Sequence, residues 1–162
     1  MRRLRDCIEP QLDIAEESYP KVLELILGYE EFVDANGDEN NEEYKNIEKQ
    51  IHEIVKKDMS LYSFWETWEG EGPEVTAFRI SLPEPFYIED LTPEEVMEII
   101  RRLKSQDFAS VKSPFGKMFS PYLGNYYHKL LKINLKKYRF SYFLVQKGGI
   151  ELTAEEILKC IL

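Results

Sequence analysis

Two segments of the chain carry a complete signal for the start of an α-helix, and they constrain the fold more than any other feature. "LTPEEVMEII" (91–100) and "LTAEEILKCI" (152–161) each place a glutamate three residues after a threonine. In this capping box the two side chains satisfy backbone N–H groups that a helix start leaves unpaired. Pro93, directly after Thr92, also suits the first helical position. We predict a helix over 91–103 and a second helix that closes the chain after Thr153.

The likeness between these two segments has two explanations. Each follows a stretch with Phe-x-x-x-Leu, Phe78 to Leu82 and Phe140 to Leu144, so a duplicated strand–loop–helix unit is conceivable. A threonine and a glutamate at this spacing are, however, a generic helix start. We favour the generic explanation.

Apolar residues at helical spacing predict four more helices, at 4–17, 20–33, 42–58 and 122–134. The first could instead begin at Pro10, because proline is tolerated only near a helix start. Asn41 is the expected cap of the third helix. The polar connection 34–43 alternates Asp and Asn like a calcium loop but lacks the glycine and the final glutamate that such a loop needs.

Residues 61–68 and 75–82 are rich in β-prone side chains and predict two strands joined by a turn at Gly70, Gly72 and Pro73. A helix over 61–68 is the competing interpretation, but the glycines favour a hairpin. Residues 138–146 predict a third strand. The expected fold is therefore α+β, an antiparallel sheet of about three to five strands packed against N-terminal helices and the two capped helices, in a single domain of residues 1–162.

Charge is unevenly distributed along the 162 residues, whose formal net charge is −9. Residues 1–100 contain 26 acidic and 9 basic residues, whereas residues 101–162 contain 4 and 12. Either the two parts attract each other, or an acidic face awaits a basic partner. The basic, aromatic stretch 128–140 could grip a nucleic acid, but the acidic excess opposes it, so no nucleic-acid partner is expected.

No apolar run approaches the length of a membrane span, and no secretory leader is recognisable, so we expect a cytoplasmic protein without a membrane partner. Cys7 and Cys160 lie near opposite ends. In a reducing compartment two free thiols are expected, with a disulfide between them as the alternative.

No arrangement of residues predicts a reaction. Phosphate-binding glycine loops and Cys-x-x-Cys or His-Glu-x-x-His motifs are missing from the sequence, and the only histidines are His52 and His128. We therefore expect no cofactor, no metal, no catalytic residue and no enzyme activity. The long segment 105–121, interrupted by prolines and glycine, is the place where a pocket would be sought.

The segment "FWETWEGEGPE" (64–74) holds both tryptophans and four of the carboxylates. Aromatic side chains dominate interface energetics, and carboxylates orient a basic partner. Equally, the indoles could fill the core while the glutamates lie on a turn. The predicted partner-binding residues are Trp65, Glu66, Trp68, Glu69, Glu71 and Glu74.

In size, charge and its Trp65–Glu69 segment the chain resembles the bacterial immunity proteins that neutralise toxins of contact-dependent or polymorphic secretion systems. The resemblance implies a binding protein that occludes a basic toxin domain, such as a nuclease, with carboxylates taking the place of phosphates. Two alternatives stay open. One is a nucleic-acid mimic that inhibits a DNA-binding machine, and the other is a small enzyme or ligand-binding domain with a site near 105–121.

Overall fold

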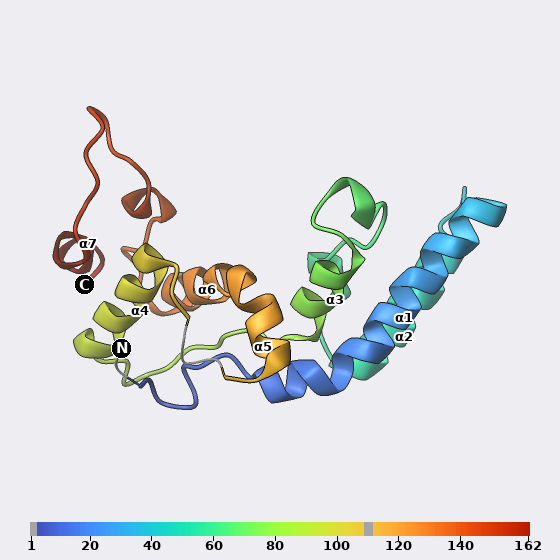
Figure 1. Cartoon of the computed structure of the whole chain (residues 1–162), viewed down its shortest axis with the longest axis horizontal. Helices are drawn as coiled ribbons and strands as arrows, with labels where there is room; N and C mark the ends of the chain where they lie inside the picture. The colour runs from blue at the N-terminus through green and yellow to red at the C-terminus, as the bar shows by residue number, and fades with distance from the viewer. Residues whose placement is uncertain (1–2, 109–111) are drawn as a thin grey trace. The chain divides into compact units, whose positions relative to one another are not determined.

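The computed structural model describes residues 3–108 and 112–162, and the regular secondary structure of this part of the chain is helical. It contains seven α-helices and four short 3₁₀ helices, without a strand (Figure 1). The prediction of an α+β fold with an antiparallel sheet is therefore wrong. All three expected strands, at 61–68, 75–82 and 138–146, are replaced by short helices and loops.

The chain forms two compact units. One, here called the inserted unit, is the continuous stretch 11–83. The other, the terminal unit, combines residues 1–10 with residues 84–162. This division does not test the expectation of a single domain, which stays a prediction. Each unit is described by itself.

The inserted unit is built on a pair of helices, α1 (Leu12–Asn36) and α2 (Glu42–Val55), which lie side by side in Figure 1. The 3₁₀ helices η1 (Met59–Leu61) and η2 (Thr67–Glu69) follow, and then α3 (Pro73–Ser81), which packs against α1. The core buries one apolar face from each helix: Val22, Ile26, Tyr29, Ile47, Ile51, Met59, Phe64, Ala77 and Ile80.

Helix α1 is one element where the sequence predicted two, because it runs through Pro20. A proline inside a helix costs about 3 kcal/mol, through a lost hydrogen bond and a clash with the preceding turn. On either side of it, Ala15 and Val22 are fully buried. Their burial on a common face, since they lie seven residues apart, favours a continuous helix across the proline.

The start of α2 is capped by Asp38, not by the predicted Asn41. The Asp38 carboxylate accepts hydrogen bonds from the backbone N–H groups of Glu43 (3.2 Å) and Tyr44 (3.0 Å). Asn41 adopts a left-handed conformation and makes no side-chain cap. The Tyr29 hydroxyl also donates to Asp38 (3.1 Å), which ties the loop to α1.

Helix α3 replaces the predicted strand 75–82 because its surroundings satisfy both of its ends. Pro73 occupies its first turn, after Gly72 at φ 95°. At its other end, the Lys57 ammonium donates to the carbonyl oxygens of Arg79 (3.1 Å) and Leu82, groups that a helix end leaves without partners. Ala77 and Ile80 are both fully buried; three residues apart, they share one face of a helix, whereas in a strand they would point to opposite sides.

The terminal unit contains α4 (Pro93–Ser105), α5 (Pro114–Phe119), η3 (Ser120–Tyr122), α6 (Gly124–Asn134), η4 (Phe140–Phe143) and α7 (Ala154–Ile161). Both predicted capping boxes are confirmed, with Thr92 paired to Glu95 and Thr153 to Glu156. The two capped helices pack against each other. The predicted loop 105–121 includes α5, and its residues 109–111 lie outside the described part of the chain.

Residues 3–10 are not the helix that was predicted to begin at residue 4; they form a chain of turns that belongs to the terminal unit. Glu9 meets the buried guanidinium of Arg102 at 2.9 Å. Arg102 also pairs with Glu98 (3.1 Å) and donates to the Tyr127 hydroxyl (3.0 Å). This network fixes the N-terminal segment against α4 and α6.

Candidate partner-binding surface

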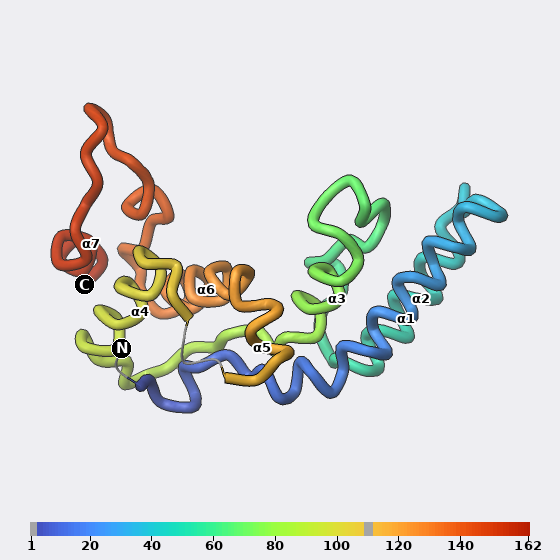
Figure 2. The backbone as a smooth tube through the Cα atoms, viewed as in Figure 1, coloured from blue at the N-terminus to red at the C-terminus, as the bar shows by residue number. Residues whose placement is uncertain are grey.

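Five of the six predicted binding residues lie on the loop that leads from η1 into α3, which we call the tryptophan loop (residues 61–71; Figure 2), and Glu74 lies in the first turn of α3. Thr67 at its centre is buried, and its hydroxyl donates to the Glu30 carboxylate on α1. The Thr67 carbonyl accepts from the N–H groups of Gly70 (3.1 Å) and Gly72 (2.9 Å). These bonds hold the loop in a defined conformation that is not a hairpin.

Phe64 anchors the loop in the core of the inserted unit. Its ring is fully buried, stacked on Tyr44 with centroids 4.2 Å apart and edge-on to Tyr29 at 5.4 Å. Burial raises the pKa of Tyr29, so its hydroxyl stays protonated and donates to Asp38. The aromatic content of this region therefore serves the core through Phe64 and the two tyrosines.

The two tryptophans differ from Phe64, because both are exposed. Trp65 is 40% exposed and rests one side against Tyr29, with ring centroids 6.0 Å apart. Trp68 is 69% exposed. Leu61, at the start of the loop, is 73% exposed. The loop thus presents three large apolar side chains to solvent, and the sequence analysis had named only two of them.

The predicted carboxylates fall into two groups. Glu71 forms a bidentate pair with Arg79, with both N–O distances 2.6 Å, and the hydrogen bonds from Arg79 lower the pKa of Glu71. Glu66, Glu69 and Glu74 are exposed. Within residues 3–108 and 112–162 their side chains have neither an ion-pair partner nor a hydrogen bond. These three carboxylates remain available to a partner, whereas Glu71 serves its own unit.

The charge asymmetry of the sequence follows the division into units. The inserted unit contains 18 acidic and 6 basic residues, a net charge of −12, and the terminal unit contains 12 and 15, a net charge of +3. The acidic excess is therefore gathered in the unit that carries the tryptophan loop, where it attracts cations over distances of about 8–10 Å at physiological salt.

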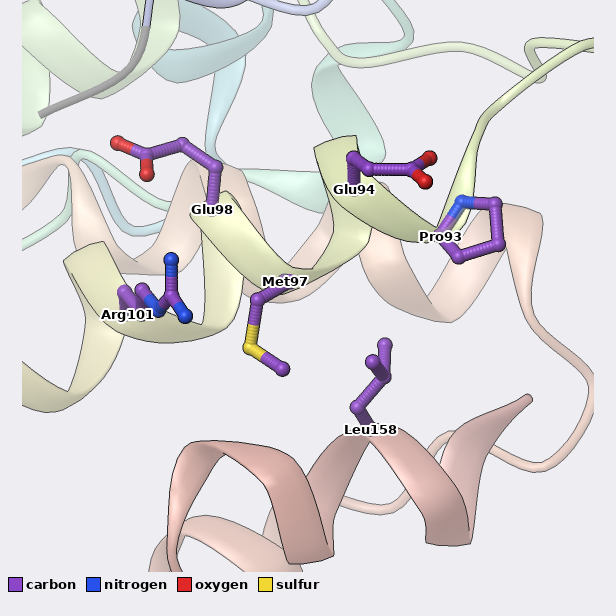
Figure 3. Close-up of a pocket in the computed structure, with 6 residues that line it drawn as sticks. All are labelled: Pro93, Glu94, Met97, Glu98, Arg101 and Leu158. Atoms are coloured by element: carbon purple, nitrogen blue, oxygen red, sulfur yellow. The ribbon is translucent and has the colours of Figure 1, made fainter.

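A groove of about 310 Å³ lies between α4 and α7 (Figure 3). Met97 and Leu158 face each other across it, and Glu94, Glu98 and Arg101 line its α4 side. The lining contains neither histidine nor cysteine.

Both histidines are hydrogen-bonded, and neither cysteine forms a disulfide. The Nδ1 atom of His52 bonds to the Lys57 carbonyl (2.6 Å), and that of His128 to the Tyr138 hydroxyl (2.8 Å). Cys7 and Cys160 are free thiols, the first half-buried and the second exposed. In the part of the chain that the structure describes, no three or more His, Cys, Asp and Glu side chains are grouped so as to hold a metal ion.

No α-helix among the described residues combines the length and the apolar character that a membrane span requires. Comparisons of the chain with models of known protein families, with curated protein sequences and with solved structures find no match. The geometry of the tryptophan loop and the distribution of charge therefore carry the argument about function.

Proposed function

We propose that this chain is a binding protein that neutralises a basic protein partner through the tryptophan loop. The partner is a toxin domain, such as a nuclease, which makes the chain an immunity protein of the bacterial type that its sequence resembles. One observation carries the proposal: Trp68 and Leu61 stand in solvent next to three carboxylates without ion-pair partners.

Exposed indoles on the tryptophan loop favour an interface. A largely exposed tryptophan such as Trp68 contributes little to its own fold, yet tryptophan is among the side chains that contribute most to interfaces. Trp68 becomes the anchor, while Trp65 and Leu61 widen the apolar contact and exclude water. Because Thr67 and Phe64 hold the loop in place, little conformational entropy is lost on binding.

The acidic surface calls for a partner with a cationic cleft. The cleft of a nuclease is lined by lysine and arginine side chains that bind phosphates. Glu66, Glu69 and Glu74 would meet those cations, and the −12 charge of the inserted unit would speed the encounter. Occupation of the cleft then excludes the nucleic acid. We place this encounter in the cytoplasm, where the two free thiols would persist.

The test begins with the complex isolated from the native host and its purified basic partner. The dissociation constant is measured for the wild type, for Trp68→Ala and for the triple variant Glu66→Gln, Glu69→Gln, Glu74→Gln. We expect Trp68→Ala to weaken binding by about 2 kcal/mol, roughly 30-fold. The triple variant should lower the association rate and its dependence on salt.

A matched control separates local charge from net charge. Glu16→Gln, Glu17→Gln and Glu31→Gln remove the same charge from exposed positions on α1 of the same unit. This variant should bind the partner within about threefold of the wild type, because it leaves the loop untouched. Equal losses in both triple variants would contradict binding at the loop.

The alternative of a nucleic-acid mimic is favoured by one observation, the concentration of 18 acidic residues in the inserted unit. The same variants distinguish it. A mimic would depend on the carboxylates and lose little when Trp68 is truncated, whereas the anchor that we propose would lose most of its affinity.

A further inference from the structure

A second surface of unusual composition lies in the terminal unit, on the segment between α6 and α7 that we call the C-terminal arm (residues 136–150). In Figure 2 it is the orange-to-red trace that leads through η4 to a turn and returns to α7. From residue 129 to residue 150 the chain has six lysines and arginines and neither Asp nor Glu. It is the most cationic stretch of a chain that is acidic as a whole.

The base of the arm is anchored to α6 through His128. The Tyr138 hydroxyl bonds to its Nδ1 atom (2.8 Å), and the rings of Phe140 and Phe143 each approach it edge-on at 4.8 Å. Burial lowers the pKa of His128, which keeps this ring neutral and compatible with its aromatic surroundings. The arm is therefore a packed element with a defined origin.

Several backbone groups at the tip of the arm are paired within the arm. The Gln146 side chain donates to the carbonyls of Ser141 (2.8 Å) and Leu144 (2.7 Å), and the Gln146 backbone N–H donates to the Ile150 carbonyl (2.6 Å). The Gly149 N–H donates to the Gln146 carbonyl (3.0 Å) and closes the turn. These internal bonds lower the cost of moving the tip out of water.

In contrast to the paired backbone, the apolar side chains at the tip are exposed to solvent. Leu144, Val145 and Ile150 are exposed to 49%, 61% and 64%. Along the sequence, Lys136 and Arg139 precede them and Lys147 lies between Val145 and Ile150. All three cations are exposed and, within the described residues, make no side-chain hydrogen bond or ion pair. Exposed aliphatic groups with cations around them are the composition of a peripheral membrane contact.

We propose that the C-terminal arm docks reversibly on an anionic phospholipid surface. Leu144, Val145 and Ile150 enter the boundary between headgroups and acyl chains, while the three cations pair with lipid phosphates and carboxylates. The sequence analysis expected no membrane partner because no segment is long enough for a span. Docking of a three-residue aliphatic tip requires no span.

Aliphatic chemistry favours lipid over nucleic acid as the occupant. A nucleic-acid surface needs aromatic rings that stack on bases, or donors that reach phosphates. Branched aliphatic side chains offer neither, and they occupy the tip, where a nucleic acid would have to be met. A bilayer is anionic at its surface and apolar just beneath, which complements both halves of the arm.

The test is sedimentation of the full chain with vesicles of phosphatidylcholine alone, or of phosphatidylcholine mixed with phosphatidylserine. We expect partitioning onto the mixed vesicles that weakens with salt, and much less onto the neutral ones. Two arm variants should each lower the partition coefficient by about tenfold or more. They are Leu144→Ser with Val145→Ser and Ile150→Ser, and Lys136→Gln with Arg139→Gln and Lys147→Gln.

Matched controls lie in the inserted unit. One replaces three exposed apolar residues of α1, Ile14→Ser, Leu27→Ser and Phe32→Ser, and the other three exposed lysines, Lys45→Gln, Lys49→Gln and Lys56→Gln. Both should partition within about twofold of the wild type. We expect every variant to fold, because all the changes are at exposed positions. Circular dichroism checks this.

Three results would overturn the proposal. The first is a wild type that does not sediment with the mixed vesicles. The second is equal loss in arm and control variants, which would show a general effect of charge or hydrophobicity. The third is a chain that does not bind vesicles but binds an acidic protein or a single-stranded oligonucleotide through the arm residues.

Discussion

The two units use charged residues in opposite ways. In the terminal unit the Arg102 guanidinium is 1% exposed and lies between Glu9 and Glu98, so charge is part of the interior. The inserted unit has an aromatic interior around Tyr29 and Phe64 and leaves its excess of carboxylates at the surface. Charge thus helps to determine which segments pack together in the terminal unit, whereas in the inserted unit it remains at the surface, where the proposed partner would meet it.

Geometry explains why the terminal unit needs directional contacts. Its residues come from both sides of a 73-residue insertion, so Glu9 and Arg102 must find each other across 93 positions of sequence. Arg5 makes a similar connection to Asp90 (2.9 Å) and Glu95 (2.5 Å). The hydrogen bonds from Arg5 lower the pKa of Glu95, which keeps that carboxylate charged at the junction.

The strongest test of this comparison is Arg102→Met. We expect it to lower the free energy of unfolding by about 4 kcal/mol, because Glu9 and Glu98 would be left beside the buried Tyr127 without a counter-charge. Urea unfolding followed by circular dichroism measures the loss. Arg101→Met is the matched control, since Arg101 is exposed and pairs only loosely with Glu155 at 3.7 Å; it should cost less than about 1 kcal/mol. Similar effects of the two changes would show that the terminal unit gains no more from its buried charge than from an exposed one.

The next test compares two aromatic residues of the same loop. Phe64→Ala should cost about 3 kcal/mol, because it removes a fully buried ring from contact with Tyr29 and Tyr44. Trp68→Ala should change stability by no more than about 0.5 kcal/mol, since the indole is largely in solvent. Thermal and urea unfolding of both variants give the answer. A large loss from Trp68→Ala would show that the indole serves the fold instead of a partner.

A smaller effect is expected from the caps. Asp38→Ala should destabilise the inserted unit by about 1 to 2 kcal/mol, because it removes the acceptor of two backbone N–H groups and of the Tyr29 hydroxyl. Thr92→Ala in the terminal unit removes one capping-box acceptor and should cost about 1 kcal/mol. The order of the two losses, measured by urea unfolding, is the prediction; the reverse order would contradict it.

The smallest effect concerns the partly exposed pair of Glu71 with Arg79. Because this pair lowers the pKa of Glu71 below its ordinary value of 4.5, its stabilisation is present above that pH and is lost as the pH falls through the folded-state pKa. Glu71→Gln should therefore cost less than about 1 kcal/mol at neutral pH, and this cost should shrink as the pH falls below 4.5. Glu69→Gln, at an unpaired position, should show no pH-dependent difference from the wild type. A cost for Glu71→Gln that persisted in acid would exclude the ion pair as its cause.

Local signals in the sequence were sufficient wherever an element is determined by its own residues. The starts of α4 and α7 were predicted from Thr92 and Thr153, because a capping box is complete within four residues. The helix over 42–58 was predicted from its apolar period and observed as α2. Segment 75–82 failed because its apolar residues fit both a strand and a helix, and the choice depends on Lys57, which is distant in sequence.

The candidate site was predictable in composition but not in exposure. The sequence places Phe64, Trp65 and Trp68 within five positions, and only the packing against Tyr29 and Tyr44 selects Phe64 for the interior. Likewise, the sequence assigned the acidic excess to residues 1–100, whereas the structure ends the acidic unit at residue 83. Arg79 as the partner of Glu71 required the turn between η2 and α3, which the sequence had assigned to a hairpin.

The order of the two units along the chain has a consequence for synthesis on the ribosome. Residues 11–83 emerge as an uninterrupted stretch and can complete their core while translation continues. The first ten residues have to wait for Arg102 and Tyr127, so Glu9 remains without its counter-ion until the later helices leave the exit tunnel. Residues 3–10, although made before residues 11–83, are therefore among the last parts of the protein to reach their native contacts.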